Sequence, residues 1–196
     1  VQECGAGLLT LTVGKLDLGE RLISVKIPEP KFKDLSEEQV NKLEEILGTE
    51  IDRSLAPLVV DVGPKFIVVS VKSGEAAVNL NSDLAQEALL EKELGANGIT
   101  LFGPYKETSE STIERIEART FAPLLGVSED PVCGSGNGAV GAFLRRHGAS
   151  IPASKRIQSS QGTRVGRDGK VFLTILEDLI SVGGSAVTVI DGNIIV

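Results

Sequence analysis

The chain has 196 residues, 41% hydrophobic and 24% charged, which is the composition of a globular rather than a disordered protein. A formal net charge of −7, scattered basic residues and an aromatic content of 4% argue against binding nucleic acid or acidic membranes. Two cysteines are too few for a disulfide framework, and no apolar run reaches the length of a membrane span.

The N-terminus carries neither a signal-peptide pattern nor a methionine. The chain begins with VQECGAGLLTLTV, which is typical of the interior of a β-strand. We therefore expect that these residues are not a complete translation product. We also expect a cytoplasmic protein with no nucleic-acid or membrane partner.

The first segment is predicted to be a hairpin. Leu8–Val13 and Arg21–Ile27 are apolar, alternating and rich in β-branched residues, with a glycine-containing connection between them. Pro28 and Pro30 then break the pattern. This divides the chain into residues 1–28 and residues 29–196.

A helix over Ser36–Leu47 carries a full set of boundary signals. Ser36 is the expected N-cap and Gln39 completes a capping box, while Leu35 and Val40 form a hydrophobic staple. Gly48 stands at the C-terminal cap position.

The rest of the chain favours strands that come in adjacent pairs. A second amphipathic helix is predicted over Ser82–Leu94, ended by Gly95. The further predicted strands are Leu58–Val62, Phe66–Val71, Ile99–Phe102, Thr112–Phe121, Lys155–Gln161, Lys170–Leu176, Ala186–Ile190 and Asn193–Val196. This order indicates an α+β fold with a mixed or antiparallel sheet rather than a doubly wound parallel one.

The residues that could take part in catalysis or binding are most concentrated in EDPVCGSGNGAVGAFLRRHG, residues 129–148. Gly136, Gly138 and Gly141 match the GxGxxG pattern of dinucleotide-binding loops. That pattern needs a strand directly before it and an acid about 20 residues after it. Pro131 interrupts an incoming strand and the region around Gln161 has no acid, so this interpretation is disfavoured.

Two other interpretations stay open. Cys133 lies at the start of a predicted helix, where the helix dipole would lower a thiol pKa, but it could also be a small residue that fills a tight turn. The amides of Gly134 to Asn137 could instead hold a substrate carboxylate at the helix N-terminus. Asp130 beside them could move a proton or serve as a turn acid.

The helix that follows, at about residues 136–147, is expected to be buried almost all round. Its positions alternate small residues with large apolar ones, and polar residues appear only in the last turn. His147 in that turn is best explained by charge complementarity at the helix end.

The stretch EDPVCGSGNGAVGAFL resembles the signature EDPxTGSAxxAL of the PhzF-like isomerases, a family named for a phenazine-biosynthesis enzyme. ARTFAP, SSQGTRVGRDGKV and VGGSAVTVIDG agree in order and spacing, and the resemblance spans nearly the whole chain. It implies the fold of diaminopimelate epimerase, in which two similar halves each wrap a mixed sheet around a central helix. Residues 1–28 would then be the tail of the first half, and 29–196 would be the second half.

The resemblance also implies roles for individual residues. Asp130 matches the active-site aspartate of the family and Ser135 its substrate-contacting serine, while Gly134 lies in the same helix-start loop. Gly136 and Asn137 are candidate substrate-binding residues because their amides belong to the proposed carboxylate cradle. It further implies a small carboxylate-bearing substrate, no cofactor or metal, and a homodimer. The family's catalytic glutamate has no counterpart in these residues, so we expect that this chain alone is inactive and that a preceding segment completes the site.

Cys133 departs from the usual threonine of the signature and coincides with the catalytic cysteine of epimerases and proline racemases. The leading hypothesis is thus a cofactor-independent isomerase. A cysteine-dependent racemase or epimerase and a non-catalytic binding protein on the same scaffold are the alternatives.

Other residues that could bind a substrate or react with it are expected to be structural or to lie at the edge of the site. Cys4 continues into a strand and is expected to be structural. Arg119 is expected to be an exposed or paired strand residue rather than a ligand of a substrate carboxylate. Gln161 and Gly162 fall in a turn that could border the cleft, and residues 167–169 are predicted to be a hairpin turn.

Overall fold

The computed structural model describes all residues except 6, 16–18, 20, 107–113, 149–155 and 194–196. Within these residues the α-helices are α1 (Glu37–Leu47), α2 (Gly74–Asn79), α3 (Leu84–Leu94) and α4 (Gly134–Arg146), with 3-10 turns η1 (Pro123–Leu125) and η2 (Thr163–Val165). The strands are β1 (Gln2–Cys4), β2 (Gly7–Leu9), β3 (Leu11–Lys15), β4 (Arg21–Lys26), β5 (Lys31–Asp34), β6 (Leu58–Asp61), β7 (Lys65–Ser70), β8 (Gly98–Pro104), β9 (Glu114–Ala122), β10 (Val127–Asp130), β11 (Ile157–Gln161), β12 (Gly169–Ile175) and β13 (Ile180–Gly184). None of these helices is long and apolar enough to cross a membrane.

One mixed sheet of eleven strands dominates the described part of the chain. Its order is β3-β4-β13-β12-β11-β9-β8-β7-β6-β5, and β10 also pairs with β9. The pairs β7–β8 and β9–β11 are parallel and the others are antiparallel. Because β4 pairs with β13, residues before position 28 share this sheet with the rest. The two-domain division stays a prediction.

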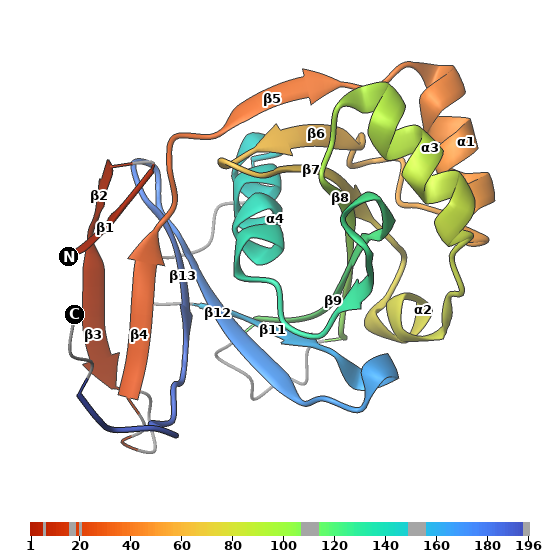
Figure 1. The fold of residues 1–196 in the computed structure, drawn as a ribbon. Coiled ribbons are helices and arrows are strands. Elements are labelled where there is room, and N and C mark those ends of the chain that lie inside the picture. The colour runs from red at the N-terminus through yellow and green to blue at the C-terminus, as the bar shows by residue number, and fades with distance from the viewer. Residues whose placement is uncertain (6, 16–18, 20, 107–113, 149–155, 194–196) are drawn as a thin grey trace.

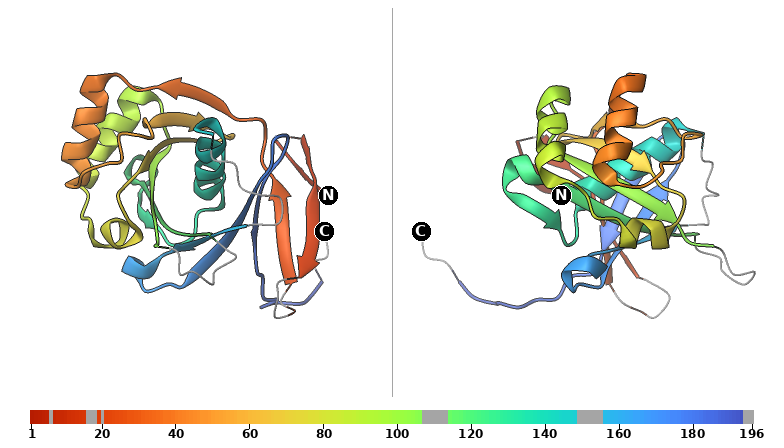
Figure 2. Two further views of the ribbon diagram at one scale, coloured as in Figure 1. Left: turned by 180° about the vertical axis from the view of Figure 1, so that it is seen from behind. Right: turned by 90° about the vertical axis from the view of Figure 1, so that its right-hand side faces the viewer.

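The sheet curves around α4, which is enclosed on several sides in both Figure 1 and the rear view of Figure 2. Strand residues that face α4, such as Val60, Val68 and Leu173, form one apolar cluster with Val140 and Phe143 of the helix. Small residues let the helix approach closely. A Cβ at Gly138 would lie 3.0 Å from Ile27, and one at Gly141 would lie 3.0 Å from Ile180.

The opposite face of the central strands is covered by α1 and α3. Here Val59, Ile67 and Val69 pack with Leu43 and Leu90 in a second apolar cluster. The two clusters bury both sides of β6, β7 and β8, which explains why these strands are apolar runs instead of alternating patterns. The α+β fold with a mixed sheet around a buried helix is confirmed.

Local signals predicted several elements well. Both hydrogen bonds of the capping box at Ser36 and Gln39 are present, and Gly48 adopts the left-handed conformation. The hairpin is present as the antiparallel pair β3–β4, but its first strand is displaced, because Leu8 and Leu9 belong to β2, which pairs with β1. The central helix begins at Gly134, two residues earlier than expected.

Other predictions were wrong. Residues 186–190 are extended and exposed but pair with no strand in the described part of the chain, and Figure 2 shows this segment leaving the body. The strand predicted there lies earlier, in β13, where Gly183 lets the chain approach Ser24 of β4. Most of the predicted strand 193–196 lies outside the described residues. The short elements α2, β5 and β10 were not predicted.

The second helix is shorter and less amphipathic than expected. Asp83, not Ser82, is its N-cap and accepts hydrogen bonds from the backbone N–H groups of Ala85 and Gln86. Its buried face includes Glu87 and Glu91, both 0% exposed. These carboxylates replace apolar side chains at two positions of the inner face.

Candidate active site at the start of the central helix

A pocket of about 450 Å³ opens where β10 leads into α4. Three of the predicted site residues line it, namely Asp130, Cys133 and Ser135. The other lining residues are Gly63, Pro64, Phe66, Asn97, Thr120, Ala122, Leu125 and Val127. The pocket therefore combines one carboxylate, one thiol and several hydroxyl or amide groups with an apolar wall.

Asp130 lies at the end of β10 and is half-buried. One carboxylate oxygen accepts a hydrogen bond of 3.0 Å from the backbone N–H of Val132. This turn bends the chain at Pro131, so that the strand ends where the pocket begins. β10 does lead directly into this loop, which corrects the expectation that Pro131 prevents an incoming strand.

Cys133 is the N-cap of α4 and is only 7% exposed. Its Sγ accepts a hydrogen bond of 3.3 Å from the N–H of Gly136 and lies 3.6 Å from Oγ of Ser135. Burial raises the pKa of the thiol, and this outweighs the hydrogen bonds from Ser135 and Gly136 that favour the thiolate. Of the two interpretations of Cys133, this burial favours a small residue that fills a tight turn over a thiol with a lowered pKa.

The glycine-rich start of α4 is largely used for packing. A Cβ at Gly136 would lie 2.7 Å from Oγ1 of Thr120 and 2.8 Å from Oγ1 of Thr100, two hydroxyls that hydrogen-bond each other at 3.0 Å. Asn137 is fully buried. Neither Gly136 nor Asn137 lines the pocket, and their substrate contacts stay a prediction.

The first turn of α4 leaves two backbone N–H groups available. Those of Gly136 and Asn137 bind the Sγ and the carbonyl oxygen of Cys133. Those of Gly134 and Ser135 have no hydrogen-bond partner among the described residues. Gly134 is exposed and nothing would obstruct a Cβ there, so a ligand can approach these two amides.

Arg119 lies behind the pocket wall, not in the pocket. It is 5% exposed and forms two hydrogen bonds with the carboxylate of Glu129, at 2.9 and 2.8 Å. The same guanidinium donates to the carbonyl oxygens of Ala77 and Leu80 at the end of α2. The prediction of a paired strand arginine is confirmed, and the partner precedes Asp130 by one residue.

The other singled-out residues lie away from the pocket or behind it. His147 ends α4, where its Nε2 lies 3.0 Å from the carbonyl oxygen of Ala56. The side chain of Cys4 lies outside the described residues. Gln161 is 1% exposed and hydrogen-bonds the loop before α4.

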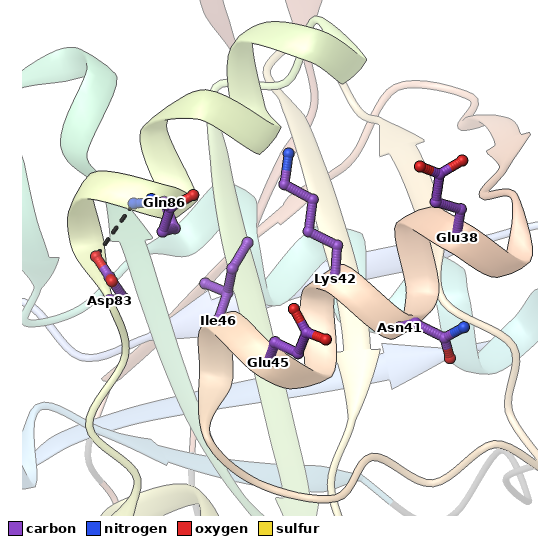
Figure 3. A pocket seen from close by; sticks show the side chains of 7 residues that line it. All are labelled: Glu38, Asn41, Lys42, Glu45, Ile46, Asp83 and Gln86. Carbon is purple, nitrogen blue, oxygen red and sulfur yellow. Dashed lines mark hydrogen bonds between the residues drawn. The ribbon is translucent and has the colours of Figure 1, made fainter.

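A larger hollow of about 730 Å³ lies between α1 and α3 (Figure 3), on the sheet face opposite α4. It is lined by Glu38, Asn41, Lys42, Glu45, Ile46, Asp83 and Gln86. Lys42 is paired with Glu93, and Asp83 caps α3. Two of its polar groups, those of Lys42 and Asp83, thus support the helices themselves. The site predicted from the sequence lies in the smaller pocket.

The chain is similar to known proteins over most of its length. The profile of the phenazine biosynthesis-like protein family, PhzC-PhzF, matches residues 1–192. Antisense-enhancing sequence 1 of Schizosaccharomyces pombe is 34% identical over 203 residues, which cover 98% of this chain and 66% of that protein. An uncharacterized isomerase of the same organism is 30% identical over 177 residues, which cover 84% of this chain and 92% of that protein.

Solved structures share the fold. A Bacillus anthracis phenazine biosynthesis protein of the PhzF family has a TM-score of 0.71 at 23% identity, covering 92% of this chain and 63% of that one. A predicted epimerase of Pseudomonas aeruginosa has a TM-score of 0.66 at 21% identity, covering 90% and 59%. The chain thus spans two thirds or less of three of these four proteins.

Proposed function

The chain belongs to the phenazine biosynthesis-like (PhzC-PhzF) family, and from this premise we propose that it serves an isomerase that moves a proton on a small carboxylate-bearing substrate. Relatives named as uncharacterized isomerases support isomerase activity at the family level. The observation that carries the proposal is that Asp130, Cys133 and Ser135 line one pocket at the start of α4.

In the proposed reaction Asp130 shares the proton transfer with the family's catalytic glutamate, which has no counterpart in these residues. A carboxylate base takes a proton from a carbon of the substrate, so that a C–H bond breaks and an O–H bond forms. The electron pair left behind shifts through the adjacent double bond, and the proton is returned to the carbon at its far end with the assistance of Asp130. No electron leaves the substrate, so this proposed shift needs no redox cofactor.

The start of α4 is proposed to hold the substrate carboxylate. The N–H groups of Gly134 and Ser135, which have no hydrogen-bond partner among the described residues, lie in the first helical turn, where the helix dipole favours negative charge. They stabilise the charge that spreads onto the carboxylate when the proton leaves. Ser135 Oγ, which lines the same pocket, is proposed to orient the bound group.

A racemase that uses Cys133 is the second candidate, because the thiol lines the same pocket. Inversion at a carbon needs acid–base groups on both faces, and a thiol must ionise to act as a base. Burial raises the pKa of Cys133, which disfavours the thiolate. The isomerase with Asp130 is therefore the better supported of the two.

Replacing Cys133 with threonine separates the two mechanisms. The full-length protein is incubated in D₂O with a panel of small unsaturated and amino carboxylates. Proton NMR follows the loss of C–H signals. For the isomerase, Cys133→Thr exchanges at a rate within about tenfold of wild type, because threonine also caps a helix and Asp130 is untouched.

Cys4→Ser is the matched control, since it removes the other thiol. Loss of exchange by 100-fold or more in Cys133→Thr alone would support the thiol mechanism instead. Binding of a carboxylate without exchange in wild type would support a non-catalytic binding protein.

A further inference from the structure

Gln161 ends β11 with its side chain buried against the loop that connects β10 to α4. Its Oε1 accepts two hydrogen bonds, from the backbone N–H of Cys133 at 3.1 Å and from Nδ2 of Asn137 at 2.8 Å. Its Nε2 donates to the carbonyl oxygen of Asp130 at 2.8 Å. One amide thus binds both ends of the segment that carries the pocket residues.

The backbone next to Gln161, both along the chain and across the sheet, lies close against the same loop. Gly162 has a φ of +94°, and a Cβ there would lie 2.6 Å from the carbonyl oxygen of Pro131. A Cβ at Gly169, which pairs with Gln161 across the β11–β12 ladder, would lie 2.4 Å from Val132. Since β11 and β12 lie in the central sheet, the loop is held against a rigid element.

The loop in turn determines where the pocket groups lie. The Asp130 carboxylate is fixed by the N–H of Val132, and Sγ of Cys133 is fixed by the N–H of Gly136. Asn137 closes the network by donating to the carbonyl oxygen of Cys133 at 2.9 Å. Gln161 touches this network from behind and does not line the pocket.

We propose that Gln161 is a positioning residue that holds the loop from Asp130 to Cys133 in the conformation in which Asp130, Cys133 and Ser135 face one pocket. The role needs an amide, because the same side chain accepts from two N–H groups and donates to a carbonyl. The proposal rests on the proposed function for the identity of the site, whereas the geometry that it describes can be tested without a substrate.

The Cys133 thiol is a reporter of this geometry. In a Cys4→Ser background it is the one cysteine left, and its alkylation rate by iodoacetamide against pH gives both its accessibility and the midpoint of its ionisation. Gln161→Glu puts a buried carboxylate against the backbone N–H of Cys133 and, once ionised, has no donor for the carbonyl oxygen of Asp130. We expect the midpoint to rise by about one pH unit or more, with alkylation at pH 8 about tenfold slower.

Gln161→Leu removes all three hydrogen bonds, so the loop loosens. We expect alkylation to become about tenfold faster, because a thiol that is 7% exposed becomes accessible. Gln158→Leu is the matched control on the same strand. Its side chain lies on the other face of the sheet, and we expect alkylation within twofold of wild type.

A Gln161→Glu protein with an unchanged midpoint and rate would overturn the proposal, as would a folded Gln161→Leu protein whose thiol is alkylated within twofold of the wild-type rate. If the Gln161→Leu protein does not fold, the ionisation midpoint and alkylation rate of the Gln161→Glu protein still test the proposal. A shifted midpoint in a protein that exchanges no carbon-bound proton would leave the positioning role standing and contradict the proposed function.

Discussion

Replacing Arg119 with methionine is expected to lower the free energy of unfolding by about 3–5 kcal/mol, because it leaves an uncompensated charge inside the protein. The carboxylate of Glu129 is only 9% exposed and receives two hydrogen bonds from this guanidinium. The carbonyl oxygens at the end of α2 lose their donor as well. Chemical denaturation monitored by circular dichroism measures the effect.

Arg115→Met is the matched control, since this arginine is exposed on the same strand and stacks on the ring of Tyr105. The loss in free energy of unfolding of this variant is expected to stay below about 1 kcal/mol. Adding Glu129→Leu to Arg119→Met is expected to recover part of the loss, because the unpaired carboxylate is then removed. A loss below about 1 kcal/mol in Arg119→Met itself would contradict a buried ion pair that stabilises the fold.

The second large effect is expected in the pH dependence of stability. Burial raises the pKa of Glu87 to about 7, and the neighbouring carboxylate of Glu91 adds to this against the hydroxyl of Ser82 and the charge of Arg119. Burial likewise raises the pKa of Glu91 to about 7, against a hydrogen bond from the N–H of Leu124. Both carboxylates also have one buried oxygen without a partner in the described residues.

The sign follows from which state binds protons more tightly. The folded pKa of about 7 lies above the ordinary value of 4.5, so the folded state keeps these protons longer. The stability linked to them is fully present below about pH 4.5 and is lost as the pH rises through about 7. At about 1.4 kcal/mol per pKa unit, a shift from 4.5 to about 7 makes each ionised glutamate cost about 3 kcal/mol at pH 8.

The double variant Glu87→Gln with Glu91→Gln keeps the shape and removes the charge. Its gain in free energy of unfolding over wild type is expected to be small at pH 4.5 and to grow by several kcal/mol at pH 8. Glu45→Gln on the exposed face of α1 serves as the control and should show no such growth. An equal gain at both pH values, or none, would contradict buried and proton-linked carboxylates.

The parts of this protein that could be predicted from the sequence are those with local signals. The capping box at Ser36 and the left-handed Gly48 depend on residues a few positions apart, and both are present. The buried character of α4 follows from its small and apolar residues, and the site loop was found through its family signature.

The parts that could not be predicted depend on contacts between distant segments. Glu87 and Glu91 would ordinarily mark a solvated helix face, but α3 turns them inward. The helix N-terminus should lower the thiol pKa of Cys133, yet its burial under the sheet raises it. The partner of Gln161 lies 28 residues away, and no spacing pattern indicates it. Strand β13 was not predicted because it ends in two glycines, which resemble a turn in sequence, and one of them, Gly183, fits closely against β4.

The central claim is that Asp130 assists the movement of a proton on a carboxylate held at the start of α4. In the full-length protein Asp130→Asn tests it most directly, because asparagine keeps the acceptor for the N–H of Val132 and removes the carboxylate. With a carboxylate that wild type exchanges in D₂O, the variant is expected to lose about 10²–10⁴-fold in kcat, with KM within about threefold. Asp34→Asn, on the exposed edge strand β5, is the control and should exchange like wild type. An Asp130→Asn protein with kcat within threefold of wild type would contradict the claim.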